Sequence, residues 1–61
     1  MKIHILGDKS KNHIQYWYDC KTWWCAEYKS QFEQVGNTEN AYTKREILII
    51  AKSLLKDLTR V

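Results

Sequence analysis

Hydrophobic and polar positions divide the chain into a strand-like N-terminal half and a helical C-terminal part. Residues 2–6 alternate weakly and end in a polar cluster at residues 7–12 that is typical of a loop. Residues 13–29 are rich in Ile, Tyr and Trp, which suit a pleated, half-buried surface. A polar interruption at residues 19–22 divides this stretch in two. The pattern predicts one strand followed by a β-hairpin.

The register of the hairpin can be argued from its side chains, because successive residues of a strand point to opposite faces. The two strands each have one apolar face, formed by Ile14, Tyr16 and Tyr18 and by Trp24, Ala26 and Tyr28. These sets share a face only if the connecting loop has an odd number of residues. We therefore expect the three-residue loop Asp19–Lys21, since an even loop would place Glu27 among the buried tyrosines.

A second polar stretch precedes the helical part. Residues 31–35 fit either a continuation of the third strand or a short extra strand, and residues 36–40 are a loop by composition. The helix then begins at Thr43, which stands in the Thr-x-x-Glu relation of a capping box with Glu46. Tyr42 and Ile47 occupy the two positions of a hydrophobic staple. Two start signals therefore coincide.

The helical part is amphipathic. Apolar residues recur at three- and four-residue steps, at Ile47, Ile50, Ala51, Leu54, Leu58 and Val61, with Leu48 and Leu55 beside them. The opposite side carries Arg45, Lys52, Ser53, Lys56 and Arg60, with Ile49 as an apolar misfit. We expect an α+β fold over residues 1–61, a single domain in which this C-terminal helix packs on one face of a three-stranded antiparallel sheet.

Composition limits the chemistry. Ten basic and seven acidic residues give a formal charge of +3, which permits nucleic acid without requiring it. No stretch resembles a signal peptide or a membrane span, so we expect a cytoplasmic protein without a membrane partner. Cys20 and Cys25 are expected to be free thiols, and with His4 and His13 they do not form the paired spacing of a zinc site. We expect no metal and no cofactor.

Large aromatic residues on both faces of the hairpin are the main functional signal, since one helix covers only one face. With the odd loop, the outer face carries Gln15, Trp17, Trp23, Cys25 and Lys29, beside His13. Adjacent exposed tryptophans on a small protein indicate a binding surface. The alternative is that these rings only shield each other.

Two classes of partner fit such a face. Tryptophan and tyrosine anchor protein interfaces, including homo-oligomers, and the modest charge favours this reading. Aromatic rings flanked by lysine also stack on bases, so DNA binding is the alternative. That reading uses the sheet or a basic helix stripe with the candidate contacts Arg45, Lys52, Lys56 and Arg60. The scattered carboxylates and the absence of a phosphate loop argue against an enzyme.

Two short motifs carry a resemblance. They are Trp23-Trp24-x-Ala26 and Thr43-Lys44-Arg45-Glu46. With strands first and a closing helix, the chain resembles phage integrase arm-binding domains, which read DNA with a sheet, and HicB-type antitoxin domains, which bind protein. The resemblance implies a small binding protein of phages or mobile elements. A phage inhibitor of a host defence protein, or a protein that sequesters a nucleotide, is a further alternative.

Overall fold

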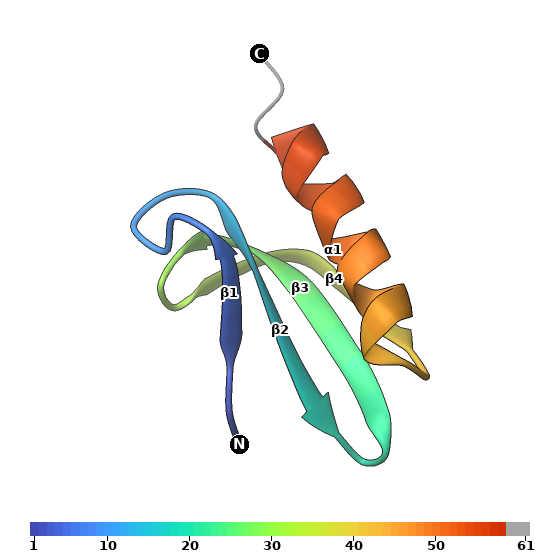
Figure 1. Ribbon diagram of the computed structural model, residues 1–61. Helices are drawn as coiled ribbons and strands as arrows, with labels where there is room; N and C mark the ends of the chain where they lie inside the picture. The colour runs from blue at the N-terminus through green and yellow to red at the C-terminus, as the bar shows by residue number, and fades with distance from the viewer. Residues whose placement is uncertain (59–61) are drawn as a thin grey trace.

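The computed structural model describes residues 1–58, which form four strands and one helix (Figure 1). The elements are β1 (His4–Gly7), β2 (His13–Asp19), β3 (Thr22–Ser30), β4 (Glu33–Ala41) and α1 (Lys44–Leu58). The strands form one antiparallel sheet in the order β1-β2-β3-β4, so each strand lies beside its neighbours in sequence. The predicted α+β class with a C-terminal helix is confirmed, but the sheet has four strands and not three.

The additional strand, β4, includes residues 36–40, for which a loop was predicted. Every residue of β4 up to Asn40 is exposed, so the strand has no apolar alternation and is held by backbone pairing with β3. The pairing moves from Cys25↔Glu39 to Glu27↔Val35, which leaves extra residues bulged out of β4. Gly36, with φ +75°, lies in this bulge. A glycine inside a strand can therefore mark a bulge and not the end of the strand.

The turn between β2 and β3 differs from the predicted odd loop. Asp19 pairs directly with Thr22, so the turn contains only Cys20 and Lys21. Their φ values are +52° and +60°, the pattern of a type I′ turn, whose twist matches that of the flanking strands. Cys20 and Lys21 are neither Gly nor Asn, so a left-handed backbone is costly for both. The two-residue turn forms nevertheless, because its twist suits the hairpin.

This even turn exchanges the faces of β3. The predicted set Ile14, Tyr16 and Tyr18 does lie on the side of the sheet that α1 covers, but its partners across the ladder are Glu27, Cys25 and Trp23. The residues predicted to share that side, Trp24, Ala26 and Tyr28, pair with Trp17, Gln15 and His13 on the opposite side. The register prediction was therefore wrong by one residue on β3, and Glu27 does share a face with the tyrosines.

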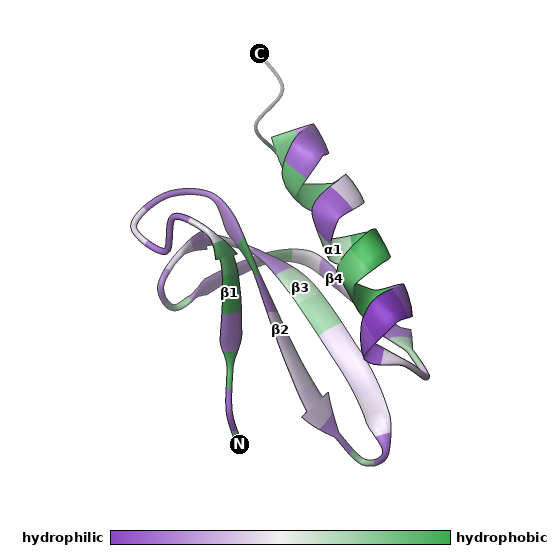
Figure 2. Ribbon diagram, in the orientation of Figure 1, coloured by the Kyte–Doolittle hydropathy of each residue, from purple (hydrophilic) through white to green (hydrophobic). Residues whose placement is uncertain are grey.

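The core lies between α1 and the sheet. Ile14, Cys25, Ile47 and Ala51 are fully buried. The side chains that pack around them are partly buried: Leu6, Tyr16, Trp23, Ala41, Ile50, Leu54, Leu55 and Leu58. The predicted apolar side of the helix is confirmed over the described residues (Figure 2). Ile49 is 63% exposed, as its position among polar residues predicted, and Val61 lies outside the described residues.

The start of α1 confirms the capping box. The Glu46 amide donates to Thr43 Oγ1 over 3.2 Å, and the Thr43 hydroxyl donates to Glu46 Oε1 over 2.9 Å. The staple was wrong, because Tyr42 is 86% exposed while Ile47 is fully buried. Within residues 1–58, the one helix is too short and too polar to cross a membrane.

Candidate functional site

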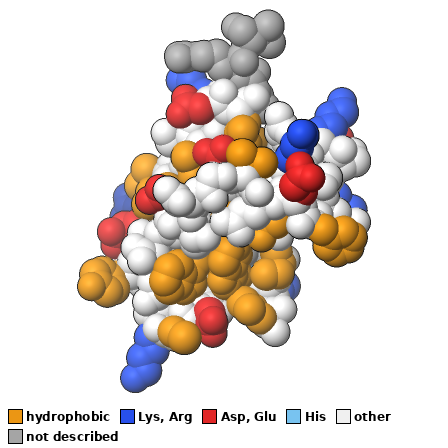
Figure 3. Space-filling view, turned by 180° about the vertical axis from the view of Figure 1, so that it is seen from behind, with side chains coloured by type: hydrophobic (Ala, Val, Ile, Leu, Met, Phe, Trp, Pro, Cys, Tyr) orange, Lys and Arg blue, Asp and Glu red, His pale blue; other side chains and the backbone are white. Residues whose placement is uncertain are grey.

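The face of the sheet opposite α1 has no element packed on it, and we refer to it as the open face. Its side chains, contributed by β1, β2 and β3, are Ile5, His13, Gln15, Trp17, Trp24, Ala26 and Tyr28. Beside it, Ile3 and Phe32 line a shallow hollow together with Ile5, Gln15, Tyr28 and Gln31. Figure 3, seen from behind the view of Figure 1, shows hydrophobic side chains gathered across this side of the molecule.

The open face is almost free of charge. Its β1, β2 and β3 side chains include no Lys, Arg or Glu among the described residues, and their one carboxylate is Asp19, at the turn; Glu33 pairs with Ser30 at the far end of β3. β4 adds the uncharged Gln34 and Asn40, opposite Tyr28 and Trp24. A chain with a net charge of +3 therefore places its cations elsewhere. This surface can contact another apolar surface without burying an unpaired charge.

Side chains on the open face partly shield one another. Ile3, Ile5 and Phe32 are 43%, 41% and 88% exposed, whereas Trp17, Trp24 and Tyr28 are partly buried. The indole Nε1 of Trp24 donates to the backbone oxygen of Asp19 over 3.0 Å, which holds the ring near the turn. The face thus combines partly buried aromatic rings with the exposed side chains of Ile3, Ile5 and Phe32.

Two polar residues are buried within this face and satisfy each other. His13 Nδ1 lies 2.7 Å from the backbone oxygen of Lys11, so Nδ1 carries the proton and donates. Its Nε2 then accepts from the Gln15 amide nitrogen over 3.0 Å, and the same amide nitrogen lies 3.3 Å from the backbone oxygen of Gln31. The network ties β2 to the β3–β4 turn and fixes the middle of the open face.

The structure separates the predicted outer-face residues. Gln15 and Trp17 lie on the open face as predicted. Trp23 and Cys25 lie on the helix side, because the two-residue turn inverts β3, so their predicted placement was wrong. Lys29 lies near the β3–β4 turn and pairs with Glu33 over 3.7 Å, an exposed ion pair that adds little stability.

Trp23 instead belongs to a second aromatic group, which we name the aromatic row: His4, Tyr16, Tyr18 and Trp23. His4 stacks on Tyr16 with ring centroids 4.9 Å apart, and Trp23 lies 6.3 Å from Tyr16 and 5.2 Å from Tyr18. The Nζ of Lys44, at the start of α1, lies 5.8 Å from the centre of the Trp23 ring. The row therefore runs across β1, β2 and β3 beside the beginning of the helix.

The two cysteines differ in their exposure to solvent. Cys20 is exposed in the turn, and Cys25 is fully buried; both are free thiols. Burial, together with the nearby carboxylates Glu39 and Glu27, raises the pKa of Cys25 to about 11. A thiol this hard to ionise is a core residue and not a nucleophile. Among residues 1–58, His, Cys, Asp and Glu side chains form no cluster that could hold a metal ion.

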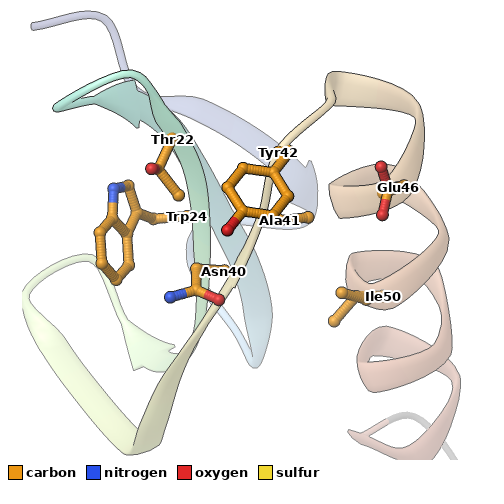
Figure 4. A pocket seen from close by; sticks show the side chains of 7 residues that line it. All are labelled: Thr22, Trp24, Asn40, Ala41, Tyr42, Glu46 and Ile50. Carbon is orange, nitrogen blue, oxygen red and sulfur yellow. The ribbon is translucent and has the colours of Figure 1, made fainter.

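A cleft of about 350 Å³ lies at the β4 edge, between the sheet and the first turns of α1 (Figure 4). It is lined by Thr22, Trp24, Asn40, Ala41, Tyr42, Glu46 and Ile50. Its one carboxylate, Glu46, is engaged by the Thr43 hydroxyl. The other polar side chains in its lining are the hydroxyls of Thr22 and Tyr42 and the amide of Asn40.

The basic helix stripe is only partly described. Arg45, Lys52 and Lys56 are exposed on α1, and Arg60 lies outside the described residues. Ile5 and Phe32 belong to the open face or its rim but were not singled out by the sequence pattern. The alternation of residues 2–6 carried a signal for Ile5, whereas nothing distinguished Phe32 in an ambiguous segment.

Comparison of the chain with protein-family models, with curated proteins and with solved structures finds no match. The resemblance to integrase arm-binding and HicB-type domains therefore stays a prediction.

Proposed function

We propose that this chain is a small non-enzymatic binding protein whose open face docks a second copy of itself. The observation that carries the proposal is the open face: apolar and aromatic, free of Lys and Arg, and with Ile3, Ile5 and Phe32 exposed beside its buried centre. Tryptophan and tyrosine at the centre of an uncharged patch are the residue types that anchor protein interfaces.

Charge favours a second copy over a different partner. The chain carries +3, so an acidic partner would be attracted to its lysines, which lie away from this face. Two identical chains of charge +3 repel each other less when the surfaces that meet carry no cations. The open face provides such a surface, and its two-fold pairing would form a β-sandwich about 10 Å thick between the copies.

The size of the core also favours association. Among the described residues, the fully buried apolar side chains are only Ile14, Cys25, Ala26, Ile47 and Ala51. A domain of this length buries about 60% of the surface of its unfolded chain and is marginal alone. Dimer formation adds buried apolar area to a protein that has little, and it couples stability to concentration.

The DNA-binding alternative is weaker on this face. Affinity for DNA comes largely from Lys and Arg that neutralise phosphates, and the paired positions of the open face carry neither. The integrase-like use of the sheet would need these cations among the aromatic rings.

Sedimentation equilibrium of paired variants tests the proposal. Ile5→Lys introduces a charge on the open face at a residue that is 41% exposed, and Ile49→Lys is the matched control on the outer side of α1, 63% exposed. We expect the wild type and Ile49→Lys to form dimers, and Ile5→Lys to stay monomeric with an unchanged circular dichroism spectrum. A monomeric wild type at about 1 mM would overturn the proposal.

A further inference from the structure

The aromatic row lies on the helix side of the sheet, where Tyr16 and Trp23 also pack against the core under α1. Tyr18 is 52% exposed, and His4, Tyr16 and Trp23 are partly buried. The row begins on β1 at His4, which pairs with Tyr16, and continues through Tyr18 to Trp23, its partner on β3. Its rings therefore form one continuous aromatic surface on the side of the molecule away from the open face.

The charges beside the Trp23 end of the row are positive. Lys44 lies over the Trp23 ring, and Arg45 follows it at the exposed start of α1. Two carboxylates lie on the same side of the sheet. Glu27 pairs with Ile14, one step further along the strands, whereas Glu39 pairs with Cys25, in the same cross-strand line as His4 and Tyr16. Glu46, in the first turn of α1, is engaged by Thr43.

We infer that the aromatic row with Lys44 binds single-stranded nucleic acid. Exposed aromatic rings stack on unpaired bases, and an ammonium group beside them neutralises the phosphates, which together make a sequence-tolerant site. Double-stranded DNA is a poorer occupant, because its bases are already stacked on each other. The row therefore has the feature that the open face lacks for nucleic acid, a cation beside its aromatic rings.

This inference is independent of the proposed dimer. The open faces of two copies would pack against each other, which leaves both aromatic rows exposed on the outside of the assembly. The monomeric variant Ile5→Lys should therefore still bind nucleic acid. If dimer formation fails in experiment, the binding site on the helix side remains testable.

Fluorescence anisotropy with labelled oligothymidylate tests the site at low and moderate salt. We expect Tyr18→Ala to lose affinity by about fivefold or more, because it removes an exposed stacking surface. The matched control Tyr42→Ala removes a tyrosine that is 86% exposed outside the row and should bind as the wild type does. Both residues are exposed enough for the variants to fold, which circular dichroism would verify.

Lysine variants give a second readout. Lys44→Gln should weaken binding and reduce the slope of log affinity against log salt by about 0.7, the value for one phosphate contact on a single strand. Lys52→Gln, a lysine exposed further along α1, should leave the slope unchanged. No binding at the lowest salt, equal binding of a duplex, or equal losses in Tyr42→Ala or Lys52→Gln would overturn the inference.

Discussion

Asp19 and Thr22 face each other directly across the β2–β3 turn, and this pairing decides which side of the sheet each aromatic residue occupies. With only Cys20 and Lys21 between them, Trp17 pairs with Trp24 and Tyr18 pairs with Trp23. One register thus produces two aromatic surfaces of different character: an uncharged open face and a row beside Lys44.

The turn itself can be improved. Lys21 has φ +60°, where a residue with a Cβ costs about 1–2 kcal/mol and glycine does not. We expect Lys21→Gly to raise the free energy of unfolding in urea titrations by up to about 1 kcal/mol. The gain is smaller than the relieved strain, because the extra entropy of Gly in the unfolded chain opposes it. Lys9→Gly, at a residue without positive φ, is the control and should not stabilise. A destabilised Lys21→Gly would contradict the two-residue turn.

The buried hydrogen bonds of Gln15 should contribute more to the free energy of unfolding than the exposed hydrogen bonds of Gln34. Gln15→Leu removes the donor to His13 Nε2 and to the Gln31 oxygen, and leaving buried groups unpaired costs about 1–3 kcal/mol. Gln34→Leu is the matched control, since the Gln34 amide donates to Gly36 and Thr38 in exposed bonds. Thermal unfolding would compare them, and equal losses would show that water reaches the Gln15 site.

Two isoleucines on α1, one buried and one exposed, form a matched pair for testing how the helix packs. Ile47 is fully buried in the core, whereas Ile49 is 63% exposed, two residues along the same helix. We expect Ile47→Val to cost about 0.5–1.5 kcal/mol of unfolding free energy and Ile49→Val to change it by less than about 0.5 kcal/mol. Chemical denaturation measures both changes in unfolding free energy. A larger loss for Ile49→Val than for Ile47→Val would contradict the observed packing of α1 on the sheet.

The raised pKa of Cys25 leads us to expect a loss of stability at high pH. Its pKa is raised from 9.0 to about 11 in the folded chain, so folding favours the neutral thiol. That contribution is fully present below pH 9.0 and is lost as the pH rises towards about 11. The unfolding free energy of the wild type should therefore fall more steeply over this range than that of Cys25→Ala.

Alkylation at neutral pH gives an independent check of the two thiols. Mass spectrometry after iodoacetamide treatment should show rapid modification of the exposed Cys20, and modification of Cys25 only when the chain unfolds. Cys20→Ala serves as the control for stability, because its side chain lies in solvent. Rapid modification of Cys25 in the folded protein would place it on an exposed face, as the sequence pattern predicted.

The helix was predictable because its signals are local. The Thr43 capping box and the spacing of Ile47, Ala51 and Leu54 depend only on neighbours within a few residues, and the structure confirms them. The α+β class was predictable from this helical spacing together with the strand-like stretch rich in Ile, Tyr and Trp before it.

The register and β4 were not predictable from these patterns. Trp23 and Trp24 are adjacent and similar, so apolar character does not decide which of them faces the helix; the turn geometry at Cys20 and Lys21 does. β4 is exposed up to Asn40, so backbone pairing holds it without leaving an apolar pattern. The predicted site around Trp17 and Trp23 combined two surfaces for this reason.

Fluorine NMR of the wild-type chain labelled with fluorotryptophan tests the central claim, which is that the open face is the self-association surface. The three resonances can be assigned with the single variants Trp17→Phe, Trp23→Phe and Trp24→Phe. Between about 10 μM and about 1 mM, we predict that the resonances of Trp17 and Trp24 shift with concentration while that of Trp23 does not. A shift confined to Trp23, or no shift of any resonance over this range, would contradict the account.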